Sequence, residues 1–159
     1  MKSLSRDDLL RPSLQETGVA KVPYSLRVTF LTAFFGGPFA ALAITIVNSV
    51  RLRRWLRDLA PLGLALAALL AFTLALYWTE WGAGLRASID GANKRGIAYL
   101  YRVIGLLFFG LGTLLHRKEQ RSAELMGLDR PNGWIAGLAC LFGGVVLSVA
   151  LAELVSAEQ

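Results

Sequence analysis

The sequence is poor in the side chains that build metal centres and disulfide frameworks. Its 159 residues include one cysteine, Cys140, and one histidine, His116. A single cysteine cannot form a disulfide within the chain, and these two residues are too few for a metal site made of several cysteine or histidine ligands. We therefore expect no bound metal and no cofactor.

Charge is nearly absent from four long apolar stretches. Hydrophobic residues make up 55% of the chain and the mean hydropathy is +0.51, which excludes a disordered chain and disfavours a soluble globule. Each stretch is about long enough to cross the roughly 30 Å hydrocarbon core as a helix. The sequence therefore predicts an all-α polytopic membrane protein, a four-helix transmembrane bundle with spans over residues 28–50, 59–79, 97–115 and 131–152.

The remaining residues are polar and form short segments. We expect a polar N-terminal tail over 1–27, a transmembrane domain over 28–155 and a short tail over 156–159. Ser5 and Asp8 in the first tail have the spacing of a helix capping box. The spans are joined by polar links over residues 51–58, 80–96 and 116–130.

The first apolar stretch contains a helix-breaking triplet, Gly36-Gly37-Pro38. Proline removes a helical hydrogen bond and clashes with the preceding turn. Two structures therefore stay open for this stretch. It is either a kinked helix that spans the bilayer or a re-entrant hairpin that turns back inside it.

The basic residues lie mainly at the ends of the apolar stretches, which bears on orientation. Lysine and arginine in short loops accumulate on the cytoplasmic side. If all four stretches cross, each side has 8 basic residues, but those of links 51–58 and 116–130 are the more densely packed. If the first stretch is re-entrant, the side of these links has 13 and the other side 3. We expect both links in the cytoplasm, near anionic lipid head groups, and expect no nucleic acid as a partner.

Small residues recur at every fourth position in three stretches, which favours close approach of helices in lipid. Each such row predicts a packing face, either within the chain or between copies of it. The rows are Ala33, Gly37, Ala41, Thr45 and Ser49; then Gly63, Ala67, Ala71 and Ala75; then Ala136, Cys140, Gly144, Ser148 and Ala152, with Gly133 and Gly137 as a GxxxG pair.

Arg102 is the one charged residue well inside a predicted span. Charges within the bilayer are costly and mark candidate functional sites. Glu80 and Glu153 fall at the same membrane face as Arg102 in every topology. Either an ion pair to one of them stabilises the bundle, or the Arg102 side chain reaches the interface between Tyr99 and Tyr101.

The sequence contains none of the usual catalytic signatures. It has no HExxH motif, no phosphate-binding glycine loop, and no serine, histidine and aspartate that can be argued into proximity. No span carries the carboxylate that proton-coupled transport uses near the bilayer centre. We expect no enzymatic activity and interpret His116 as an interfacial residue of a basic link.

One segment resembles a known group of proteins. Residues 34–41 read Phe-Phe-Gly-Gly-Pro-Phe-Ala-Ala, and Asn48 and Arg51 follow. This segment resembles the F-x-G-G-P-x-A motif of a widespread group of small bacterial membrane proteins of unassigned function. The resemblance implies four helices and a bacterial inner membrane, and it implies no catalytic residue.

The composition and patterning favour a non-enzymatic membrane protein that acts through helix–helix contacts. Such a protein is an accessory subunit, an immunity-type protector or a homo-oligomer, and its partners are the bilayer and another membrane protein or itself. The alternative is a small transporter or channel subunit. The structural candidates are Gly36, Gly37, Pro38, Asn48, Arg102, Gly133, Gly137, Gly144 and Glu153.

Overall fold

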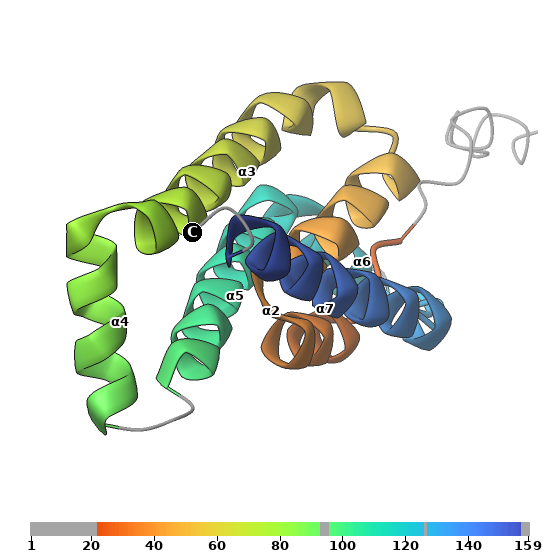
Figure 1. Ribbon diagram of the computed structural model, residues 1–159. Coiled ribbons are helices and arrows are strands. Elements are labelled where there is room, and N and C mark those ends of the chain that lie inside the picture. Colours follow the sequence, from red (N-terminus) through yellow and green to blue (C-terminus); the bar gives the residue numbers. More distant parts are fainter. Residues whose placement is uncertain (1–21, 93–95, 126, 157–159) are drawn as a thin grey trace, which may run out of the picture.

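The computed structural model describes residues 22–92, 96–125 and 127–156, which form helices and no strand. The capping box predicted at Ser5 and Asp8 lies outside the described residues, as does most of the predicted tail over 1–27. Figure 1 shows the arrangement of the helices, which are α2 (Leu26–Arg51), α3 (Trp55–Trp78), α4 (Glu80–Ala92), α5 (Gly96–Leu115), α6 (Arg117–Leu125) and α7 (Trp134–Ser156).

The prediction of a helical membrane protein is confirmed. By their whole length and composition, α2, α3, α5 and α7 are long and apolar enough to cross a bilayer, but a break at Gly37 divides α2 into two shorter arms. Two of the predicted polar links contain helices: α4 lies in the link over 80–96 and α6 in the link over 116–130. Helix α3 also begins at Trp55, before the predicted boundary, which places Asp58 in its first turn. A carboxylate there interacts favourably with the positive end of the helix dipole.

Helix α2 is interrupted at Gly37. This residue has φ +71° and ψ −164°, a backbone conformation that is essentially restricted to glycine. Pro38 follows and cannot donate a backbone hydrogen bond. The helix therefore stops at the glycine pair and starts again at the proline, in two arms over 26–36 and 38–51.

The two ends of α2 lie side by side. The Tyr24 amide donates to Asn48 Oδ1 at 3.0 Å, and Arg51 Nε donates to the Val22 carbonyl at 2.9 Å. A straight helix would separate the ends of α2 by about 38 Å. The arms are about 16 and 20 Å long, which is too short for either to cross the hydrocarbon core. Of the two structures left open by the sequence, the chain adopts the re-entrant hairpin (Figure 1, orange).

Helix α5 packs against one side of this hairpin. Gly105 of α5 faces its tip, where an added Cβ would lie 2.7 Å from the Ala33 carbonyl oxygen and 3.0 Å from Gly37 C. Gly112 faces Thr45 of the second arm, where a Cβ would lie 2.6 Å from the threonine hydroxyl. The small residues of the first predicted row thus let α5 approach the hairpin closely.

Helix α7 packs against the hairpin along another face. Gly137 faces Val28, and Gly144 faces Ala40, with an added Cβ 2.6 Å from the Ala40 nitrogen. Gly105 and Gly144 are near the middle of α5 and α7, so the tip of the hairpin lies about midway along both helices. The hairpin is the centre of the fold, since its contacts with α5 and α7 are the most extensive between helices.

The row of small residues on α3 is not a packing face within the chain. Gly63, Ala67 and Ala71 are exposed, and a Cβ at Gly63 would meet nothing within 4 Å. The buried side of α3 is instead formed by larger residues, including Leu62 and Leu69. These pack on Phe39 and Leu42 of the hairpin, because bulky side chains fill the wider separation between the two helices.

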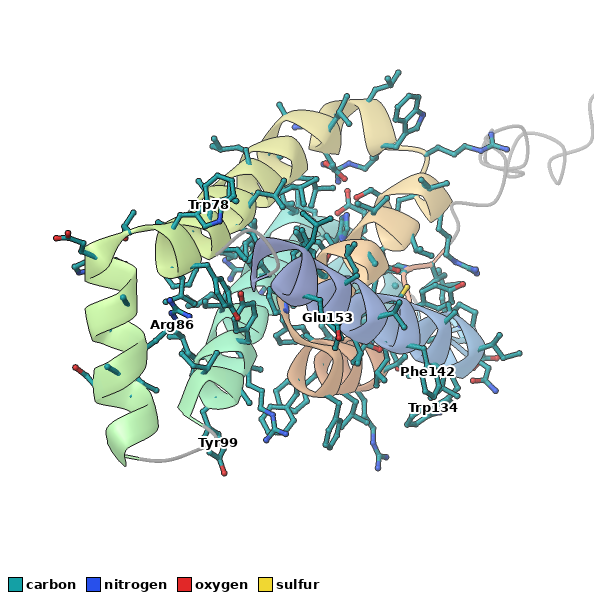
Figure 2. All side chains as sticks on the ribbon, in the orientation of Figure 1. Trp78, Arg86, Tyr99, Trp134, Phe142 and Glu153 are labelled. Atoms are coloured by element: carbon teal, nitrogen blue, oxygen red, sulfur yellow. The ribbon has the colours of Figure 1, made fainter. Side chains whose placement is uncertain are left out.

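Tryptophans mark two levels along the bundle. Trp55 and Trp134 begin α3 and α7 at one end, and Trp78 ends α3 at the other, about 35 Å away along the helix axis. Figure 2 shows Trp134 and Phe142 on the outer side of α7. This spacing fits the two interfacial levels at which tryptophan is enriched in membrane proteins.

Replacing Gly37 by alanine should destabilise the fold through the backbone alone. No neighbour would clash with the new Cβ, but alanine disfavours the observed φ and ψ, by about 1–3 kcal/mol. We expect a lower melting temperature in detergent. The matched variant Gly63→Ala, in an exposed helical position, should melt at or above the wild-type temperature. Equal melting of the two variants would contradict the hairpin conformation.

Candidate functional site

Three polar side chains are buried together where the hairpin, α3 and α5 meet. Ser49 lies near the end of the second hairpin arm, Asp58 in the first turn of α3, and His116 directly after α5. Their exposed fractions are 1%, 2% and 2%. This cluster is the most deeply buried set of titratable and nucleophilic groups that the described residues contain.

His116 holds the cluster together through one ring nitrogen. Its Nε2 lies 3.0 Å from Ser49 Oγ and 3.2 Å from Asp58 Oδ2. When Nε2 carries the ring proton, it donates to the Asp58 carboxyl oxygen. The Ser49 oxygen then lies beside an N–H group rather than beside a lone pair.

This geometry differs from that of a hydrolase relay. In that arrangement the serine and the aspartate occupy opposite nitrogens of the imidazole, so that one nitrogen accepts the serine proton. Here both partners are on Nε2. A nitrogen that donates to Asp58 cannot also accept a proton from Ser49, and the arrangement connects α2, α3 and the end of α5.

An ion pair extends the cluster to the surface. Arg54 pairs with Glu119 of α6, and its Nη2 lies 4.0 Å from Asp58 Oδ1. The polar network thus runs from His116 through Asp58 and Arg54 to Glu119. It joins the link over 51–58 to the link over 116–130.

Burial sets the protonation of His116. Desolvation lowers the pKa of His116 below its ordinary value of 6.5, the hydrogen bond to Asp58 and the charge of Asp58 oppose this shift, and Arg54 adds to it. The net direction is downward, so the imidazole is neutral at pH 7 in the folded chain.

On sequence alone, His116 is interpreted as an interfacial residue, and no serine, histidine and aspartate can be argued into proximity; the structure shows His116 buried and hydrogen-bonded to Ser49 and Asp58. Ser49, Asp58 and His116 are far apart in sequence, and no motif spacing connects them. One signal was nevertheless present. Each lies next to or within link 51–58 or link 116–130, and both topologies place these links on the same membrane face.

The cavity beside the cluster is small. It is lined by residues of both hairpin arms, α5 and α6, and its volume of about 10 Å³ has room for about one water molecule. Among residues 22–92, 96–125 and 127–156, no three histidine, cysteine, aspartate or glutamate side chains gather as ligands for one metal ion. The polar residues that line this cavity are Thr29, Thr45, Asn48, Thr113, His116 and Gln120.

Arg102 does not belong to this cluster. Its guanidinium carbon lies 5.6 Å from the ring centroids of both Phe34 and Tyr99, at a distance typical of cation–π contacts. The ion pairs found among the described residues do not include Arg102. Glu153 is exposed near the end of α7, as Figure 2 shows.

The other residues singled out by sequence shape the hairpin and its packing. Gly36, Gly37 and Pro38 form the tip, where a Cβ on Gly36 would lie 3.0 Å from Leu141 Cα. Asn48 is buried and accepts the hydrogen bond that holds the two ends of α2 together. The remaining three are the glycines of α7 and its approach that contact the hairpin: Gly133, Gly137 and Gly144.

No protein-family model, curated protein or solved structure matches this chain. The resemblance to small bacterial membrane proteins stays a prediction.

Removing the carboxylate of the cluster should destabilise the protein strongly. Asp58→Ala leaves the buried His116 ring without its acceptor, and an unsatisfied buried polar group costs about 1–3 kcal/mol. We expect a large fall in melting temperature in detergent. The control is Glu124→Ala, which removes a surface ion pair to Arg130 worth at most about 1 kcal/mol. Similar losses in the two variants would show that the cluster does not hold the helices together.

The stability should also depend on pH through His116. The folded pKa of His116 is lowered, so the unfolded chain takes up a proton at higher pH than the folded chain does. Stability contributed by neutral His116 is therefore complete above pH 6.5 and falls as the pH drops below it. We expect thermal melts between pH 7.5 and 5.5 to show this loss in the wild type and a flatter profile in His116→Asn. Parallel profiles would contradict a buried neutral histidine.

Proposed function

We propose that this chain is a non-enzymatic membrane protein that acts through contacts of its outward-facing helices. It serves as an accessory subunit, an immunity-type protector of another membrane protein, or a homo-oligomer. One observation carries the proposal. Ser49, Asp58 and His116 are buried and bonded to one another, whereas large apolar side chains face outwards along α3, α5 and α7.

The cavity that His116 lines has little room for a substrate. The polar cavity beside His116 has a volume of only about 10 Å³, and small-molecule sites are usually clefts of roughly 300–1,000 Å³. The outward faces, by contrast, include glycines at which nothing lies within 4 Å of an added Cβ, namely Gly63 on α3, Gly110 on α5 and Gly143 on α7. Such positions allow the close backbone approach by which helices associate in lipid.

The hairpin supports an orientation in a bacterial inner membrane. Because both ends of α2 lie on one face, the residues before it and the links over 51–58 and 116–130 share that face. Apart from Arg102, nine of the basic residues that the structure describes fall on this face and one, Arg86, on the other. The positive-inside rule then places the two links in the cytoplasm, where anionic lipid head groups attract them.

A small transporter or channel subunit is the second candidate, and the hairpin itself favours it. Re-entrant segments and broken helices that meet near the bilayer midplane occur in channels and transporters, where they line cavities. In the single chain, Gly105 and Gly144 pack against the tip closely. A path for a solute would therefore run between copies of the chain.

Tryptophan substitutions at the three open glycines test the proposal. Gly63→Trp, Gly110→Trp and Gly143→Trp should each preserve the melting temperature, because nothing within 4 Å clashes with the first added carbon. At least one should abolish association with a partner or with a second copy, measured by crosslinking in the native membrane followed by purification. The inward-facing Gly144→Trp serves as the control that disrupts the fold itself.

Reconstituted proteoliposomes separate the two candidates. We expect the purified chain to add no ion flux above empty vesicles. The proposal would be contradicted if all three tryptophan variants showed ion flux and also associated as the wild type does. The chain would then not act through contacts of its outward-facing helices.

A further inference from the structure

Helices α3 and α5 diverge and leave an apolar groove between them. The walls run from Pro61 to Phe72 on α3 and from Leu100 to Leu111 on α5, and the groove has a volume of about 680 Å³. Figure 1 shows how α4 joins the two helices at their far end. A hydrogen bond of 3.4 Å between Thr73 Oγ1 and Tyr101 Oη connects them near that end.

The groove has the length of one leaflet. Eleven residue steps along each wall correspond to about 16 Å, close to half of the roughly 30 Å hydrocarbon core. The groove is therefore too short for a transmembrane helix of a partner, which would need the whole thickness. It lies midway along α3 and α5, about one helical turn from the basic pocket at their ends.

A basic pocket continues the groove toward the links. It has a volume of about 670 Å³ and is lined by the start of α3, the end of α5 and the start of α6. Arg57 of this pocket precedes Pro61 of the groove by one helical turn, and Leu115 follows Leu111 by one turn. Residues four apart lie on the same face of a helix, so the pocket and the groove follow each other along the same faces of α3 and α5.

The pocket has a surplus of positive charge. Its lining includes four basic and two acidic residues. The two acids are engaged, since Asp58 bonds to His116 and Glu119 pairs with Arg54. The other three basic residues are exposed and take part in none of the ion pairs of the described residues: Arg53, Arg57 and Lys118.

We propose that this site binds one anionic phospholipid, with its phosphate head group among Arg53, Arg57 and Lys118 and an acyl chain in the groove between α3 and α5. The positive pocket complements the phosphate, and the groove beside it accepts the chain. The proposal rests on the contact of the basic links with anionic head groups in the proposed function, and it replaces a diffuse attraction with a defined site.

Bound lipid would connect two helices that otherwise touch little. The backbones of α3 and α5 make few contacts with each other. An acyl chain lying between these helices would therefore add packing contacts with both. A ligand that binds only the folded state raises stability by mass action. The anionic lipid should therefore raise the melting temperature of the wild type.

Native mass spectrometry of the full-length chain in detergent tests the site. Dioleoylphosphatidylglycerol and dioleoylphosphatidylcholine have the same acyl chains and differ in the net charge of the head group. We expect the wild type to bind the anionic lipid in preference. Arg57→Gln combined with Lys118→Gln should weaken that binding about 20- to 30-fold, as expected for two basic side chains at a membrane surface.

Two matched controls separate the site from general effects of charge and bulk. Arg117→Gln combined with Arg121→Gln removes the same amount of charge from the link over 116–130 outside the pocket and should preserve binding. Ala68 lines the groove, whereas the neighbouring exposed Ala67 does not. Ala68→Trp should therefore abolish binding of the anionic lipid, and Ala67→Trp should preserve it.

Three outcomes would overturn the proposal. They are equal binding of the two lipids by the wild type, unchanged binding after the loss of Arg57 and Lys118, and a dimer that Ala68→Trp dissociates while lipid binding stays unchanged. The last would identify a second copy as the occupant of the groove. Lipid binding is measured on the purified chain, whereas association is measured in the native membrane. Lipid binding can therefore be absent while association persists, and association can be absent while lipid binding persists.

Discussion

The fold depends on the requirement that every backbone polar group inside a bilayer be satisfied by protein. A helix interrupted halfway through the membrane exposes amides and carbonyls that lipid cannot bond. Here the interruption at Gly37 is covered on two sides, by α5 at Gly105 and by α7 at Gly144. The close approach of these helices is possible only because neither glycine has a side chain. The hairpin and the two helices around it are therefore one structural unit.

The return of the hairpin also creates the buried cluster. It brings Ser49 back to the face where α3 begins and α5 ends, and so next to Asp58 and His116. Burying these groups is favourable only because each has a partner. The cluster and the ion pair between Arg54 and Glu119 then fix α3 and α6 relative to the hairpin. Farther along α3 this constraint is absent, and there the groove opens between α3 and α5.

Much of the fold could be predicted from the sequence, because bilayer thickness and hydropathy determine it. The long apolar helices and the break at Gly36-Gly37-Pro38 follow from local composition. The choice between a kink and a hairpin depends on contacts such as Tyr24 with Asn48, between residues 24 positions apart, which no local pattern reports. The small residues of α3 were misleading for a related reason. A row of alanine and glycine permits close packing, but here larger side chains on the other face, such as Leu69, make the contact.

The candidate site was less accessible to sequence reasoning. Each of Ser49, Asp58 and His116 has ordinary sequence neighbours, and only their common membrane face connects them.

The hairpin requires that α2 enters and leaves the bilayer on one face. Labelling with a membrane-impermeant thiol reagent tests this most directly. In a chain with Cys140→Ala, single cysteines replace Arg27 before the tip, Arg57 after α2, or Ser88 on α4. The hairpin predicts that Arg27→Cys and Arg57→Cys react from the same side and Ser88→Cys from the other; labelling of Arg27→Cys and Arg57→Cys from opposite sides would contradict it.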